Sequence, residues 1–292
     1  MEKQPLITVL SLAYNHAPYI RQALESFVRQ ETSFPMEVVI HDDASQDGTA
    51  EIIREYETSY PDILRPIYQK ENQTVLGRNL IREILVPNIR GKYVAICEGD
   101  DFWTDMQKLQ KQVAYMEEHP DCSMTASSAD LVYEEETICT IERHNEECDM
   151  DADEIITGGG NWLATASLCC RTDIFMDYPR FRAYAAIADY PLMILAAIKG
   201  KVHYFPESMA AYRYMRPESW SATIPVGQDI QRKKEWIEAE ITLYTRLLQY
   251  SPQHEKAVLR RRKIFETELW HLGVYDFGGY METIKRLEDP AI

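Results

Sequence analysis

The chain has 292 residues, of which 45% are hydrophobic and 27% are charged. This composition is typical of a folded globular protein with one large or two small domains, and it argues against a disordered chain. The 31 Lys and Arg against 47 Asp and Glu give a formal net charge of −16, which argues against nucleic-acid binding through a basic surface and against electrostatic docking on anionic lipid.

The first half of the chain alternates predicted strands with predicted helices. Short apolar runs predict strands at residues 7–13, 36–40, 64–68 and 92–97. Apolar residues at helical spacing predict helices around residues 20–28, 52–56, 76–85 and 109–116. Such an alternation indicates a mostly parallel sheet flanked by helices, in which ligands bind beyond the carboxyl ends of the strands.

The second half has a weaker pattern. The acidic stretch 134–154 predicts an exposed excursion, and three glycines at 158–160 predict a flexible joint. Further elements are predicted as a helix opened by Asp189, strands at 202–205 and 209–214, and charged helices from about residue 227. The longest apolar run, residues 191–198, is far shorter than the roughly 20 residues that cross a bilayer, so no transmembrane segment is expected.

The six cysteines form no C-x-x-C pair, which disfavours a zinc site. Most of them have apolar neighbours, as buried free thiols do. We therefore expect a reduced, cytoplasmic protein.

Two acidic loops directly follow predicted strands. Glu98-Gly-Asp-Asp101 follows one of them, and residues 41–48, which include Asp43, follow another. Carboxylates this close repel one another unless a cation or hydrogen-bond donors compensate, and oxygen-rich clusters suit Mg²⁺ or Mn²⁺. The same residues also fit ordinary solvated turns that cap the next helix, so the residues alone leave both interpretations open.

A third segment, Tyr14-Asn15, ends the first predicted strand and belongs to the same edge of the sheet. A tyrosine there can stack on a flat base, or it can simply be half-buried core. The carboxylate of Asp43 can accept a hydrogen bond from a nucleobase N–H group. Asp47 and Thr49 are expected to have mainly structural roles in their turn.

Together the three segments resemble the family-two-type inverting glycosyltransferases of GT-A fold. The segments are a strand followed by Y-N, a strand followed by D-D-x-S-x-D-G-T and a strand followed by E-G-D-D. The resemblance covers residues 5–120 well. Beyond residue 120 it depends on Asp189 before an apolar helix and on Tyr212-Arg213 after the strand-like segments.

The resemblance implies an α/β, GT-A-like domain over residues 1–226, with a nucleotide-binding half to about residue 120, an acceptor half over 121–226 and a helical extension over 227–292. It implies transfer of a sugar from a nucleoside-diphosphate donor, with UDP or dTDP favoured, to a hydroxyl of a glycan or lipid-linked acceptor. The cofactor would be Mg²⁺ or Mn²⁺. By analogy the reaction would belong to polysaccharide or cell-envelope glycan synthesis, in the cytoplasm or in peripheral contact with the inner face of the membrane.

The resemblance also assigns roles to single residues. Donor-nucleotide contacts fall to Tyr14, Asn15, Asp43, Arg78, Glu98 and Asp100. Metal ligation falls to Asp101 and Asp100, and the role of general base to Asp189, whose carboxylate would take the proton of the acceptor hydroxyl. Trp103, beside the acidic loop, is a weaker candidate for a platform under the acceptor sugar.

Two positions depart from the family pattern. Ala188 stands where a glutamate often precedes the base, and Met215 stands where a histidine often follows Tyr-Arg. These departures leave room for a catalytically inactive nucleotide-sugar-binding or scaffold protein. A sugar nucleotidyltransferase is disfavoured because the first strand is not followed by a glycine-rich phosphate loop.

Overall fold

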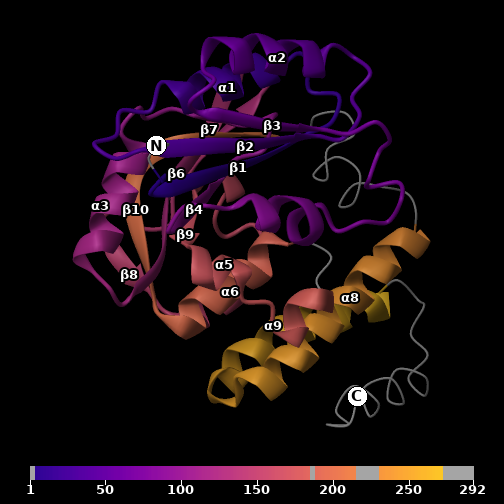
Figure 1. Cartoon of the computed structure of the whole chain (residues 1–292). Helices are drawn as coiled ribbons and strands as arrows, with labels where there is room; N and C mark the ends of the chain where they lie inside the picture. Colours follow the sequence, from indigo (N-terminus) through magenta and orange to yellow (C-terminus); the bar gives the residue numbers. More distant parts are fainter. Residues whose placement is uncertain (1–3, 185–187, 215–229, 272–292) are drawn as a thin grey trace. The chain divides into compact units, whose positions relative to one another are not determined.

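The structure, a computed structural model, describes residues 4–184, 188–214 and 230–271 (Figure 1). The chain divides into two compact units. Unit 1 comprises residues 1–149, 163–176 and 200–213, and unit 2 comprises residues 150–162, 177–199 and 214–292. This division does not coincide with a boundary at residue 226, because two segments from the middle of the chain pack with the C-terminal helices.

A mixed sheet forms the centre of unit 1. Its strands follow the order β3-β2-β1-β4-β9-β6-β10-β5, with β7 beside β6 and β8 beside β10. The strands are β1 (Ile7–Ala13), β2 (Met36–Asp42), β3 (Leu64–Tyr68), β4 (Tyr93–Ile96), β5 (Phe102–Trp103), β6 (Cys122–Tyr133), β7 (Glu136–Ile141), β8 (Cys148–Met150), β9 (Cys169–Arg171) and β10 (Lys201–Arg213).

The helices of unit 1 are α1 (Ile20–Val28), α2 (Thr49–Ser59), the π-helical turn η1 (Ile81–Leu85), the 3₁₀ turns η2 (Val86–Asn88) and η3 (Thr165–Ser167), α3 (Lys108–Glu118) and α5 (Thr172–Met176). Those of unit 2 are α4 (Ala152–Gly158), η4 (Arg180–Tyr184), α6 (Asp189–Lys199), α8 (Ile230–Tyr250), η5 (Pro252–His254) and α9 (Glu255–His271).

The first four strands form the parallel sheet predicted from the apolar runs. β1 pairs in parallel with both β2 and β4, and β2 pairs in parallel with β3. Helices α1 and α2 lie together on one side of these strands (Figure 1). Ile7 and Val9 of β1 pack in one core cluster with Leu24 and Phe27 of α1. Leu10, on the opposite face of the strand, is also buried, so the run is apolar on both faces.

The rest of the sheet contains antiparallel pairs that the apolar pattern did not predict. β9 runs antiparallel to β4 and β6, β7 runs antiparallel to β6, and β5 runs antiparallel to β10. The strands predicted at 202–205 and 209–214 are one strand, β10, whose register shifts between Phe205 and Ser208. Pro206 lies within that shift, where its missing N–H group costs no regular ladder bond.

Two other segments differ from the expectation. The stretch 134–154 is largely exposed, as expected, but it has regular structure and contains β7, β8 and the start of α4. The helix expected at 76–85 is replaced by turns followed by η1, because Gly77 adopts a left-handed backbone and Asn79 accepts a hydrogen bond from the N–H group of Arg82 at 2.9 Å.

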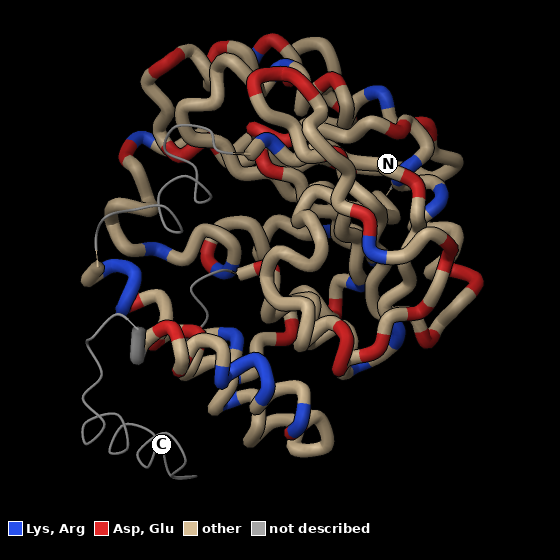
Figure 2. The backbone as a smooth tube through the Cα atoms, turned by 180° about the vertical axis from the view of Figure 1, so that it is seen from behind, with Lys and Arg blue, Asp and Glu red and all other residues tan. Residues whose placement is uncertain are grey.

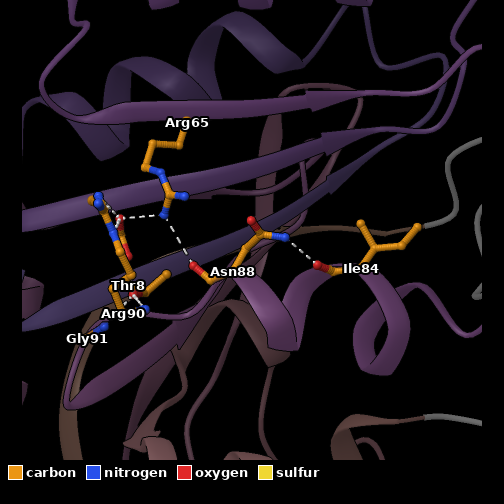
Figure 3. A network of polar contacts seen from close by, with 7 residues as sticks. Thr8, Arg65, Ile84, Asn88, Arg90 and Gly91 are labelled. Atoms are coloured by element: carbon orange, nitrogen blue, oxygen red, sulfur yellow. Dashed lines mark hydrogen bonds and ion pairs between the residues drawn. The ribbon is translucent and has the colours of Figure 1, made fainter.

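A buried ion network ties together β1, β2, β3 and the segment before β4 (Figure 3). The carboxylate of Glu37, only 2% exposed, accepts hydrogen bonds from Thr8 at 2.7 Å, from Arg65 at 2.9 Å and from Arg90 at 2.7 Å. Burial opposes the charge of Glu37, but Arg90, Thr8 and Arg65 outweigh it and hold its pKa below the usual value. The network therefore stabilises the parallel strands away from their carboxyl ends.

Unit 2 is helical. α8 packs on α9 and η4, and α4 packs on α6 and α9. Aromatic contacts join α8 to α9, with the rings of Trp236 and Phe265 5.3 Å apart and those of Tyr244 and Phe265 5.8 Å apart. The helices predicted after residue 227 are thus confirmed over the described part of that segment. A search of the described helices finds none that combines the length and the apolarity needed to cross a bilayer.

Candidate active site

A pocket of about 130 Å³ lies at the carboxyl ends of β1, β2 and β4. Its lining residues are Leu12, Ala13, Tyr14, His16, Asp43, Thr74, Leu80 and Glu98. Three of the predicted donor residues, Tyr14, Asp43 and Glu98, therefore come together from three separate loops. This is the position in which open α/β sheets bind ligands.

The acidic loop passes very close to β1 and α1. The N–H group of Gly99 donates to the carbonyl of Leu12 at 2.8 Å. A Cβ atom at Gly99 would lie 2.8 Å from Cδ1 of Ile20 and 3.1 Å from Nδ1 of His16, so only glycine fits without a shift. This close approach holds Glu98 on the wall of the pocket and brings the carboxylate of Asp100 to 3.9 Å from Nδ1 of His16.

The buried carboxylate of Asp43 is held by the loop that follows β3. Its Oδ1 accepts from the N–H group of Gln73 at 2.7 Å, and its Oδ2 accepts from the N–H group and the hydroxyl of Thr74 at 3.1 and 2.8 Å. Asp43 therefore fixes one wall of the pocket as well as lining it. This structural role was not foreseen from the sequence, since Gln73 and Thr74 are thirty residues away.

Asn15 ties the first loop to the second. It has a left-handed backbone (φ 53°), its N–H group donates to Ser45 Oγ at 2.9 Å, and its side chain accepts from the N–H group of Gln46 at 2.9 Å. Thr49 accepts from the N–H group of His16 at 2.8 Å, and Asp47 accepts from that of Ala17 at 2.9 Å. The side chains of Asn15, Asp47 and Thr49 thus shape the pocket edge without lining the pocket.

Asp100 and Asp101 are both buried, 5% and 2% exposed, whereas Glu98 is exposed. Oδ1 of Asp101 accepts from the N–H group of Arg213 at 2.9 Å. Burial, reinforced by the charge of Asp100, raises the pKa of Asp101 well above the usual value. The Arg213 guanidinium donates to the carbonyl of Asp100 and to the side chain of Gln22. Asp101 therefore anchors the acidic loop to β10, while Glu98 lines the pocket and Asp100 lies buried beside His16.

Arg78 and Trp103 are not part of the pocket lining. The Arg78 side chain is half exposed and donates to Glu83 at 2.9 Å and to Gln73 at 3.2 Å. Trp103 is 4% exposed, its Nε1–H donates to the carbonyl of Ala166 at 2.9 Å, and its ring packs 4.8 Å from that of Phe27. Trp103 is thus a core residue, and its burial argues against the predicted role as a sugar platform.

Asp189 begins α6, as predicted, and belongs to unit 2. Its Oδ1 accepts from the N–H group of Tyr190 at 2.7 Å, and Pro191 follows at the first turn, where its missing N–H costs no helical bond. Met215, where the family pattern has histidine, lies outside the described residues.

The carboxylates of the acidic loop suit a divalent cation that also binds a diphosphate. Within the described residues, no group of three or more His, Cys, Asp or Glu side chains forms a ready-made metal site. Mg²⁺ and similar hard cations are commonly held by one or two carboxylates together with phosphate oxygens, so Asp100 and Glu98 suffice if a diphosphate completes the coordination.

Sequence reasoning missed His16, Thr74 and Leu80 as pocket residues. His16 directly follows Tyr14-Asn15, and its position two residues after a predicted binding tyrosine was the available signal. Leu80 belongs to the stretch 76–85 that was predicted as a helix, and Thr74 lies just before it in a segment for which no element was predicted.

Known proteins resemble this chain over different lengths. Residues 8–143 match the family model described as glycosyl transferase family 2. An uncharacterized protein of Mycobacterium tuberculosis, Rv1520, is 34% identical over 236 residues, which cover 79% of this chain and 63% of that protein. The chain thus spans less than two thirds of the length of this curated relative. TuaG of Bacillus subtilis, named as a teichuronic acid biosynthesis glycosyltransferase, is 32% identical over 46% of this chain and 50% of its own.

Solved structures share the fold. TarS 1–349 of S. aureus in complex with UDP-GlcNAc aligns with a TM-score of 0.67 and 16% identity over 87% of this chain and 71% of that chain. The mannosyltransferase PcManGT of Pyrobaculum calidifontis, in complex with GDP-Man and Mn²⁺, aligns with a TM-score of 0.57 and 14% identity over 98% and 81%. Residues 8–143 therefore belong to glycosyl transferase family 2, and the chain has the GT-A fold.

Proposed function

We propose that the protein is a metal-dependent inverting glycosyltransferase that moves a sugar from a nucleoside diphosphate to an acceptor hydroxyl. The observation that supports this most strongly is the pocket in which Tyr14, Asp43 and Glu98 meet at the carboxyl ends of three parallel strands of a family 2 domain. Tyr14 supplies an exposed ring for a base, and the acidic loop supplies carboxylates for the cation that accompanies the diphosphate.

Each of these groups has a defined task in the proposed reaction. Asp100 and Glu98 would hold Mg²⁺ or Mn²⁺, and the cation would supply positive charge to neutralise the departing diphosphate. Asp189 accepts the proton of the acceptor hydroxyl as its oxygen attacks the anomeric carbon, and the bond from that carbon to the diphosphate breaks. A single displacement of this kind inverts the configuration, and a well-placed base contributes on the order of 10²–10⁴-fold to the rate.

The donor and acceptor are proposed by class. TarS is described with UDP-GlcNAc and PcManGT with GDP-Man, so the fold accommodates different bases. We favour a UDP- or dTDP-sugar because the carboxylate of Asp43 suits an imide N–H of a pyrimidine. The name of TuaG supports a glycan or lipid-linked acceptor and a role in polysaccharide or cell-envelope glycan synthesis.

The test is nucleotide release from a panel of UDP-, dTDP- and GDP-sugars in the presence of Mn²⁺. We expect one donor class to be turned over, and we expect Asp189→Asn to bind UDP normally while losing about 10²–10⁴-fold in rate. The matched control is Asp177→Asn, which removes a carboxylate from the same unit that pairs only at the surface with Lys199. If wild-type protein binds UDP but releases nucleotide from none of the sugars, the inactive binding protein replaces this proposal.

A further inference from the structure

His41 in β2 is a fully buried histidine that has no role in the reaction proposed above. Its side chain is 0% exposed, and neither ring nitrogen has a hydrogen-bond partner within the described residues. Asp and Glu recur along much of the chain (Figure 2), so nearness to a carboxylate alone would not distinguish a histidine. A buried polar group without a hydrogen bond costs stability, however, and its presence therefore calls for an explanation.

The position of His41 in the sheet places it beside the nucleotide pocket. Side chains alternate between the two faces of a strand, so His41 and Asp43 share one face. In the register of the sheet His41 is opposite Leu12 of β1 and Ile67 of β3. Leu12 also lines the pocket. His41 therefore has apolar neighbours on both adjacent strands, where an apolar side chain would be the ordinary choice.

One oxygen of Asp43 lies close to the imidazole ring. Nε2 of His41 is 4.0 Å from Oδ1 of Asp43, which is too far for a hydrogen bond. The same oxygen accepts the N–H group of Gln73 at 2.7 Å, while Oδ2 holds Thr74. Protonation makes both ring nitrogens donors, and a shift of about 1 Å brings Nε2 within hydrogen-bond distance of the carboxylate. Protonated His41 and the Gln73 amide then compete for one oxygen.

We propose that His41 is a positioning residue for Asp43: the neutral imidazole leaves the carboxylate on Gln73 and Thr74, and the protonated imidazole draws it away from them. This inference rests on the proposed function, in which Asp43 accepts a hydrogen bond from the nucleobase. Proton uptake by His41 and nucleotide binding therefore oppose each other, because both act on the same carboxylate. The proposal explains why a polar ring occupies a position between apolar neighbours.

The charges around His41 support this role. Burial lowers the pKa of His41, and the negative charges of Asp43 and Asp42 oppose this effect without cancelling it. β1 has no titratable side chain. The titratable groups on the other segments beside β2 are Arg65 and Tyr68 of β3, Arg78 of the following loop, and Arg82 and Glu83 of η1. Arg65 is paired with Glu37, and Arg78 with Glu83. His41 is therefore neutral at neutral pH and takes up a proton only below its usual pKa of 6.5.

The test is an NMR titration of the nucleotide-free, full-length protein from neutral pH down to the onset of acid unfolding. The ring signal of His41 is assigned by its loss in His41→Leu. We expect this signal to titrate below pH 6.5, and the amide signals of Gln73 and Thr74 to shift with the same midpoint. In His41→Leu the amide shift disappears. In the control His119→Leu, which removes a histidine at the end of α3, the shift is unchanged.

Amide signals that stay constant while His41 titrates overturn the proposal. So does an amide shift that persists in His41→Leu, because it then originates from His16, the other histidine at the pocket. We expect His41→Leu to fold with an unfolding temperature at or above that of the wild type, since leucine leaves no buried polar atom without a partner. His41→Gln, which is polar but does not titrate, is a second variant that lacks the shift.

The effect on the donor site is measured separately, as the Kd for UDP in the presence of Mn²⁺. Below the His41 midpoint we expect the wild-type Kd to rise relative to that of His41→Leu by up to tenfold per pH unit, because one proton opposes binding. A ratio of the two Kd values that does not change with pH contradicts the proposal. The NMR titration requires no nucleotide, so its failure is distinguishable from an absence of UDP binding or of sugar transfer.

Discussion

At the scale of single residues, three neighbouring carboxylates have three different environments. Glu98 is exposed on the pocket wall, Asp100 lies beside His16, and Asp101 is buried against the backbone of Arg213. The difference arises from contacts with distant segments, since Arg213 lies 112 positions further along the chain. The chemistry of the loop therefore depends on which carboxylate the rest of unit 1 leaves accessible.

Asp43 offers a test at this scale. Asp43→Asn places an NH₂ group against one of the backbone donors of Gln73 and Thr74, which leaves a buried donor without an acceptor and costs about 1–3 kcal/mol. We expect hydrogen exchange at these two amides to accelerate by roughly 5- to 150-fold and UDP to bind more weakly. Glu51→Gln, at an exposed position of α2, serves as control. Unchanged exchange at both amides would show that Asp43 does not hold the loop.

At the scale of elements, the two ends of the parallel strands have separate tasks. The carboxyl ends of β1, β2 and β4 surround the pocket, whereas Glu37, near the start of β2, joins β1, β2 and β3 through Thr8 and Arg65. Stabilising charges are thus kept away from the carboxylates proposed to bind the cation.

Glu37→Gln tests the stabilising role. Removing the charge of Glu37 lowers the free energy of unfolding by about 1–3 kcal/mol, because its charge-assisted hydrogen bonds with Arg65 and Arg90 weaken, although these two side chains are 36% and 40% exposed and remain partly hydrated. The folded-state pKa of Glu37 is lowered, so its contribution is complete above the unfolded value of 4.5 and is lost as the pH falls through the folded value. We therefore expect the stability gap between wild type and variant to narrow below about pH 4.5 in thermal unfolding. A gap that is constant from pH 7 to pH 3 would contradict this account.

The elements also show which parts of the fold can be predicted from the sequence. The strands β1 to β4 and the helices α1, α2, α3 and α6 could be predicted because each presents an apolar run or stripe to the core. β7 could not, since it is largely exposed and has no alternating apolar face. β6 was missed because Ser, Thr and Ala fill its buried positions. Residue types at the strand ends located the pocket, but contacts such as Asp43 with Thr74 required the fold.

At the scale of the whole molecule, we propose that carboxylates of unit 1 hold a divalent cation against a nucleoside diphosphate. The cation would offset negative charge in a protein whose formal net charge is already −16. The pocket, the family 2 match and the shared fold all support a nucleotide site in unit 1. In the proposed reaction, unit 2 supplies Asp189 at the start of α6.

The most direct measurement is thermal unfolding with UDP, dTDP, GDP or CDP, each with and without Mn²⁺. We expect one nucleotide to stabilise the wild type only when the metal is present, by about 2.7 kcal/mol at a concentration 100 times its Kd. Asp100→Asn should abolish this gain, while Asp189→Asn should retain it. If no nucleotide stabilises the protein with metal present, or if Asp100→Asn responds like the wild type, the acidic loop does not hold a metal–diphosphate complex and the account is wrong.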